Sequence, residues 1–157
     1  MIALLFLAVL NAFSTPTKTS WMSPEAFHLA VGMRRSKAVA VLEGGGWKPR
    51  AGKAANHLVV EYGESRSVTL EFARNHLRSI RFELFDFIPA VRSAFAEETA
   101  DLKSRYGPAH TKGAGILLYE KGRPNIMVVM STDPRTTAGQ QGLGFLTVRY
   151  FEPPAVE

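Results

Sequence analysis

The chain of 157 residues contains no cysteine and only four histidines. Without cysteine there can be no disulfide framework, no thiolate metal site, no cysteine nucleophile and no lipid anchor on an N-terminal cysteine. None of the histidines has a second histidine or a carboxylate at ligand spacing on one helix; they are His28, His57, His76 and His110. We therefore expect no metal, no cofactor and no catalytic residues of the serine-histidine-aspartate kind.

Long apolar runs are also scarce, and the one strong candidate lies at the N-terminus. Residues 1–10 are uncharged and apolar, but a membrane-spanning helix needs about 20 such residues. Ala12 and Ser14 then supply the small side chains that a signal peptidase prefers, so we predict a signal peptide over residues 1–14. Because no Lys or Arg precedes the run, a buried N-terminal strand or helix is the alternative. The mature chain is expected to be periplasmic or secreted, without a transmembrane span.

Composition is otherwise that of a globular domain, with 46% apolar and 21% charged residues. The formal net charge is +5, and the excess lies within residues 34–53, which contain six basic residues and a single acidic one, Glu43. Such a patch can meet phosphates, anionic headgroups or an acidic protein surface, although a solvated surface is the simpler interpretation. Trp47 could stack a ligand beside these cations or close over the core. The candidate binding residues are Arg34, Arg35, Lys37, Trp47, Lys48, Arg50 and Lys53.

Two segments of the chain resemble each other. Residues 58–72 align without a gap on residues 116–130, apolar run on apolar run and turn on turn. Each is preceded by an apolar residue, an aromatic residue and a proline at nearly the same offset. This pattern predicts a tandem duplication, although two β-hairpins of equal length could also align by chance.

Periodicity places a helix before each of these segments. Ala38, Val41 and Leu42 share a helical face that ends at three glycines. A longer stripe of residues spaced by three or four predicts a helix between Asp86 and Gly107. Alternating residues predict three strands after each helix. The expected fold class is therefore α+β, with two tandem helix-plus-three-strand antiparallel units packed as one domain. The units span residues 27–86 and 87–152, after a linker over residues 15–26, and they form either one six-stranded sheet or two smaller sheets.

The expected register suggests one pair of acidic residues. Pairing Val60 with Leu70 and Leu70 with Phe82 places Glu61 and Glu83 on the outer face, flanking Thr69. Backbones two strands apart are about 10 Å from each other, which suits an inverting glycosidase, although solvated surface charges are the simpler interpretation. Residues 132–144 form a polar, glycine-rich loop, a second candidate contact region.

The segment from Gly32 to Leu42, followed by glycine and an aromatic-proline pair, resembles the entry motif of small bacterial envelope proteins of the BamE (SmpA/OmlA) type. The layout also resembles that of the tandem-repeat β-lactamase inhibitor protein. The resemblance covers some 50 residues and departs at Arg34, where a hydroxyl residue is usual, at Glu43-Gly44, and in the missing lipid-bearing cysteine. It implies an envelope protein that works by binding, and no functional residue carries over.

These observations lead us to expect an exported, non-enzymatic binding or structural module of the bacterial cell envelope. Its partner would be an envelope protein or an anionic envelope component. Nucleic acid is not expected as a partner, because nucleic-acid binding conflicts with export. The alternative is a hydrolase acting on a sugar or anionic polymer through Glu61 or Glu83, for which a pocket containing an aromatic residue would be the distinguishing feature.

Overall fold

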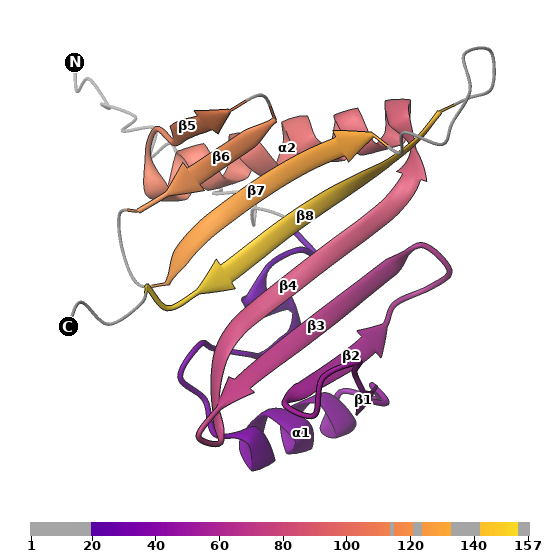
Figure 1. Cartoon of the computed structure of the whole chain (residues 1–157), viewed down its shortest axis with the longest axis vertical. Coiled ribbons are helices and arrows are strands. Elements are labelled where there is room, and N and C mark those ends of the chain that lie inside the picture. The colour runs from indigo at the N-terminus through magenta and orange to yellow at the C-terminus, as the bar shows by residue number, and fades with distance from the viewer. Residues whose placement is uncertain (1–19, 114, 121–123, 133–141, 154–157) are drawn as a thin grey trace, which may run out of the picture.

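Eight antiparallel strands form one continuous sheet in the part of the chain that the structure describes, residues 20–113, 115–120, 124–132 and 142–153. Figure 1 shows this computed structural model, with the strands toward the viewer and helix α2 behind them. The strands are β1 (Arg50–Ala51), β2 (His57–Glu61), β3 (Arg66–Ala73), β4 (His76–Phe87), β5 (His110–Gly113), β6 (Ile116–Tyr119), β7 (Asn125–Thr132) and β8 (Leu143–Phe151). Their order across the sheet is β1-β2-β3-β4-β8-β7-β6-β5.

The expected fold of two tandem helix-plus-three-strand units is wrong. The long strands β4 and β8 pair directly, from Ser79 opposite Phe151 to Phe87 opposite Leu143, and so join all the strands into one sheet. In addition, the short edge strands β1 and β5 bring the sheet to eight strands instead of six. Because β4 and β8 satisfy each other's backbone groups, neither is left as an exposed edge, and a single core forms beneath them.

Helix α2 (Ile88–Tyr106) covers one face of this sheet, where it contacts β4, β7 and β8. Val91 and Leu102 are buried, and Phe95 and Tyr106 pack against the core, so the predicted helical stripe is confirmed. Pro89 stands in its first turn and Gly107, with φ of 81°, follows its end, as the chemistry of helix termini favours. The other helix, α1 (Arg35–Gly44), adds Ala38 and Leu42 to the same core and begins beside the β3–β4 turn.

The N-terminal segment of the described chain is packed into this core and is not extended. A short 3-10 helix, η1 (Pro24–Phe27), begins at Pro24, and His28 adopts a left-handed conformation after it. Met22 and Phe27 are buried, with 1% and 4% of their surface exposed. The predicted signal peptide lies outside the described residues, as do residues 15–19 of the expected linker.

Strand register follows the sequence pattern, with a correction of two residues. Val60 lies opposite Val68, and Leu70 lies opposite Ile80. A shift of two residues keeps every side chain on its expected face, because the side-chain period of a strand is two. The core face therefore carries the predicted apolar residues, including Leu58, Val60, Val68, Leu70, Phe72, Ile80, Phe82 and Leu84. The β3–β4 turn at Arg74 and Asn75, both with positive φ, fixes that hairpin.

The opposite face of the sheet carries neither described helix, and we call it the bare face. Neither helix in the described ranges is both long enough and apolar enough to span a membrane.

Candidate functional site

One end of the bare face carries exposed aromatic side chains. Phe85 and Phe87 on β4 and Phe145 on β8 have 38%, 47% and 38% of their surface exposed. Phe85 and Phe145 lie opposite each other in the register, with ring centroids 4.7 Å apart. An antiparallel sheet that faces solvent on one side usually has polar residues on that side, so this aromatic cluster of Phe85, Phe87 and Phe145 departs from the usual pattern.

Sequence reasoning did not single out the aromatic cluster, although a signal was present. From Ile80 to Leu84 the apolar residues of β4 alternate, but at Leu84 and Phe85 two consecutive residues are apolar. A strand with large apolar residues on both faces is usually buried on both. Here neither described helix covers the second face. The broken alternation therefore marks an apolar surface that stays exposed.

Beside the aromatic cluster, the bare face also carries pairs of opposite charge. Arg149 on β8 donates to Glu71 on β3 at 3.0 Å and to the Ser79 hydroxyl at 2.7 Å. Two further pairs join Arg81 to Glu83 at 3.5 Å and Arg50 to Glu61 at 3.4 Å. Three arginines thus meet three glutamates, so these pairs add no net charge to the face.

The two glutamates of the hydrolase interpretation lie on the bare face, but they flank Ser67 and not Thr69. An open hollow of about 680 Å³ lies beside them, and its walls include Phe85 and Phe145. The carboxyl of Glu61 is on a side chain that is 67% exposed, and that of Glu83 is on one that is 38% exposed. A glycosidase acid usually occupies an apolar pocket, which neither side chain does.

The seven residues of the basic stretch fall into two groups and a core residue. Arg34, Arg35 and Lys37 lie at the start of α1, whereas Lys48, Arg50 and Lys53 follow its end, and a helix of ten residues is about 15 Å long. Within the second group, Arg50 reaches the bare face through its ion pair with Glu61. Trp47 instead packs between Phe27 and Tyr62, at centroid distances of 5.2 and 5.1 Å, which confirms the interpretation as a core residue. The loop over residues 132–144 lies largely outside the described residues.

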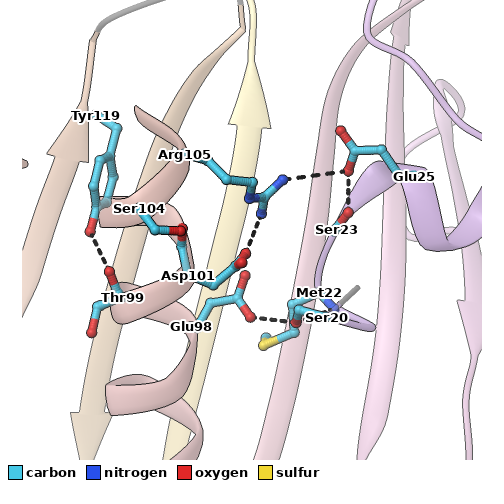
Figure 2. Close-up of polar contacts among 10 residues, drawn as sticks. All are labelled: Ser20, Met22, Ser23, Glu25, Glu98, Thr99, Asp101, Ser104, Arg105 and Tyr119. Carbon is cyan, nitrogen blue, oxygen red and sulfur yellow. Dashed lines mark hydrogen bonds and ion pairs between the residues drawn. The ribbon is translucent and has the colours of Figure 1, made fainter. Parts of the chain in front are cut away.

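A second feature lies on the covered face, where the N-terminal segment crosses α2. Figure 2 shows Glu98 and Arg105 of α2 reaching toward Ser20 and Glu25 of that segment. The Ser20 hydroxyl donates a hydrogen bond to one carboxylate oxygen of Glu98, and Arg105 lies 3.9 Å from Glu25. Arg105 is also held by Asp101 one turn earlier, at 2.6 Å.

Glu98 is the most deeply buried charged residue in the described chain, with 4% of its surface exposed. Its second carboxylate oxygen, Oε1, has no hydrogen-bond partner among the described residues. Burial raises the pKa of Glu98 above its ordinary value, and the charge of Asp101 adds to this, while the Ser20 hydrogen bond opposes it. Burial and the nearby carboxylate of Glu98 together raise the pKa of Tyr150 and of Tyr119. Among the acidic groups of the described residues, Glu98, Tyr119 and Tyr150 are the ones whose pKa is raised.

In the described residues, no group of three or more histidine, aspartate and glutamate side chains is arranged to hold a metal ion. Comparison of the chain with family models, curated proteins and solved structures finds no significant match. The resemblance to BamE-type proteins therefore stays a prediction.

Proposed function

We propose that this protein is an exported, non-enzymatic binding module of the cell envelope and that a partner protein docks on its bare face. The observation that carries the proposal is the aromatic cluster of Phe85, Phe87 and Phe145, which are the exposed large hydrophobic side chains of the described residues. Exposed apolar surface of this kind marks interaction sites, and aromatic residues are enriched at the centre of protein interfaces.

The size of the cluster is sufficient to anchor a complex. Covering the exposed part of three phenylalanine side chains removes on the order of 200 Å² of apolar surface from water. At about 25 cal/mol per Å², this contributes roughly 5 kcal/mol before the cost of association is subtracted. Anchors of this strength, surrounded by weaker polar contacts, are the usual composition of a binding surface.

The charges of the bare face favour a protein partner over an anionic polymer. Its arginines Arg50, Arg81 and Arg149 are each engaged by a glutamate, so the face offers alternating charges and little net positive potential. A polyanion needs a continuous basic surface, whereas a protein surface can match paired charges of both signs.

The basic stretch has a supporting role in this proposal. Lys48 and Lys53 flank the edge strand β1 and can attract an acidic partner toward the bare face. Replacing Lys48, Arg50 and Lys53 together by glutamine should therefore slow association mainly at low salt, because steering is screened by ions. An association rate that does not change at low salt would remove this role.

Photo-crosslinking tests the docking surface directly. We would replace Phe145 by p-benzoylphenylalanine, which keeps an aromatic ring at the position, and irradiate cells that produce the full chain. We expect one discrete protein adduct, which unlabelled wild-type chain competes away. As a matched control, Ala90 on the exposed side of α2 carries the same residue and should give no such adduct. Equal labelling at the two positions, or none at position 145, would reject the proposal.

A hydrolase acting on a sugar or anionic polymer is the second candidate, because the hollow beside Glu61 and Glu83 has an aromatic wall. It requires Glu83→Gln to abolish cleavage of an envelope polysaccharide that the wild-type chain degrades. If the wild-type chain releases no new reducing ends, this candidate fails while the docking proposal stands.

A further inference from the structure

A cluster of basic side chains lies where the β3–β4 turn meets the start of helix α1. We call it the basic tip, and it consists of three arginines, a lysine and a histidine: Arg34, Arg35, Lys37, Arg74 and His76. The backbone brings its two segments together, because the Arg35 N–H donates to the Asn75 carbonyl oxygen at 2.8 Å and Arg34 forms a β-bridge with His76. Figure 1 shows this turn beside α1 at the lower end of the molecule.

The basic tip is far from the aromatic cluster. Strand β4 has 12 residues and runs from His76 at the tip to Phe87 in the aromatic cluster. At about 3.3 Å per residue, roughly 36 Å of strand separate the two. A partner bound at the tip therefore leaves the aromatic cluster accessible.

The four cations of the basic tip form no ion pair with a carboxylate among the described residues. Five arginines outside the tip each form one: Arg50, Arg78, Arg81, Arg105 and Arg149. The first turn of α1 contains no acidic residue either. Positive charge is therefore concentrated, without compensation from the described residues, at this end of the molecule.

The basic tip is also held in a defined shape. The Arg35 guanidinium lies over the Phe72 ring, 5.2 Å from its centroid. In the turn, Arg74 and Asn75 both have positive φ, and the His76 Nδ1 atom lies 3.0 Å from the Arg74 carbonyl oxygen. The exposed cations therefore project from a backbone that is already ordered, which lowers the cost of binding a partner.

We propose that the basic tip binds an acidic segment of a partner protein, whose carboxylates pair with its exposed arginines. This surface is separate from the bare face and does not depend on docking there. Three of its four cations are arginines, and a planar guanidinium can pair with a carboxylate through two hydrogen bonds at once. A cluster of such groups at fixed positions suits a segment that carries several aspartate or glutamate residues.

An anionic membrane is the other surface that such a cluster could meet. Membrane attraction is weak for each cation, so four cations without an apolar anchor reach an affinity only of about the millimolar range. The exposed large apolar side chains of the described residues are all in the aromatic cluster, at the far end of β4. The tip therefore has no such anchor, and directed pairing with carboxylates is the stronger interaction.

The test uses the full mature chain and two probes at physiological ionic strength. The first is a fluorescein-labelled peptide of alternating aspartate and glutamate residues, followed by fluorescence anisotropy. The second is vesicles of equal parts phosphatidylcholine and phosphatidylglycerol, followed by co-sedimentation. We expect saturable binding of the peptide and no co-sedimentation with the vesicles.

Substitutions locate the peptide on the chain. Arg34→Gln combined with Arg74→Gln removes two cations of the tip and should weaken peptide binding about tenfold or more, as expected for loss of charge-assisted hydrogen bonds. As a matched control, Arg92→Gln combined with Lys103→Gln removes the same charge from exposed positions on α2. The control should change the affinity by less than about twofold.

Two results would overturn the proposal: equal weakening by the two double variants, which would show attraction to net charge alone, or co-sedimentation with the vesicles that the tip variant abolishes, which would identify a membrane surface. If the tip variant does not fold, as judged by circular dichroism, Lys37→Glu decides, because an acidic residue is favourable in the first turn of a helix. Peptide binding weakened about tenfold by Lys37→Glu supports the site, and unchanged binding overturns it.

Discussion

At the scale of single residues, Glu98 is a carboxyl group that the fold buries although burial disfavours its charge. It lies on the face of α2 that packs on the sheet, three residues after Phe95 and four before Leu102. The Ser20 hydroxyl satisfies one carboxylate oxygen, and the surroundings disfavour the ionised form. One of the polar contacts between α2 and the N-terminal segment therefore depends on the protonation of one side chain.

This gives a prediction about pH. Because burial raises the pKa of Glu98 in the folded state, the folded chain holds this proton more tightly than the unfolded chain. The contribution of Glu98 to stability is present below the ordinary pKa of the carboxyl and is lost as pH rises through the raised value. Glu98→Gln removes this dependence, so the variant should gain stability relative to the wild type as pH rises from 4 to 8.

Urea unfolding at several pH values measures this difference. Glu97→Gln, an exposed neighbour on the same helix, is the control and should show no such trend. If the difference in the free energy of unfolding between the Glu98→Gln and wild-type chains stays constant across the range, the folded state does not raise the pKa of the Glu98 carboxyl.

A residue of the site could be predicted from the sequence only where its role follows from its immediate neighbours in the chain. Glu98 lies on the same face of α2 as Val91, Phe95 and Leu102, but periodicity does not single it out, because a glutamate is not a typical member of an apolar helical stripe. In the same way, Trp47 is ambiguous in sequence, since packing against Phe27 and Tyr62 depends on segments distant in the chain.

At the scale of secondary-structure elements, the start of β8 lies close both to β7 and to the first turns of helix α2. A methyl group on Gly144 would lie 3.1 Å from the Ser131 carbonyl oxygen on β7 and 3.5 Å from Ile88 at the start of α2. The contact with the Ser131 carbonyl oxygen is tighter than usual, whereas the distance to Ile88 is an ordinary one, so a side chain at this position has to shift the backbone of β7 relative to β8.

Gly144→Ala should accordingly destabilise the chain by roughly 1–3 kcal/mol, the usual cost of overpacking a core. The same substitution at Gly44, the last residue of α1, meets no atom within 4 Å. Gly44→Ala should instead stabilise by about 0.5–1 kcal/mol, because alanine favours the helix. Thermal and urea unfolding of both variants measure the signs, and a Gly144→Ala chain as stable as the wild type would contradict this packing.

Elements with strong local signals were predictable, and short ones were not. Helix α2, with its regular stripe, proline and terminal glycine, was predicted within a residue of its ends. Strands β1 and β5 have two and four residues, and such short strands depend on a neighbouring strand for their hydrogen bonds. The register was predicted two residues away, because the alternating pattern fixes the face of a strand and not its offset.

At the scale of the whole molecule, pairing between β4 and β8 decides the architecture. These strands are separated by some sixty residues of sequence, and their apolar patterns would equally suit two separate sheets. The error in the expected fold came from this long-range choice. The bare face is its consequence, since one wide sheet with both helices on one side leaves the other side uncovered.

The compartment is a further prediction at this scale. If residues 1–14 are a signal peptide, the mature chain begins at Thr15, and Ser20 and Met22 lie only a few residues after the new N-terminus. Mass spectrometry of the chain recovered from an expressing bacterium should therefore give a mass that starts at Thr15. A mass that retains Met1 would contradict export by this route.

The most direct test of the docking proposal is the affinity of the purified partner found by crosslinking at Phe145. We predict that replacing Phe85 and Phe145 by serine weakens binding about a hundredfold, as expected for loss of central aromatic anchors. The double variant should still unfold cooperatively, because neither side chain belongs to the buried core. Ala90→Ser on the opposite side should leave the affinity unaltered. If the double variant binds within about twofold of the wild-type affinity, the bare face is not the binding surface.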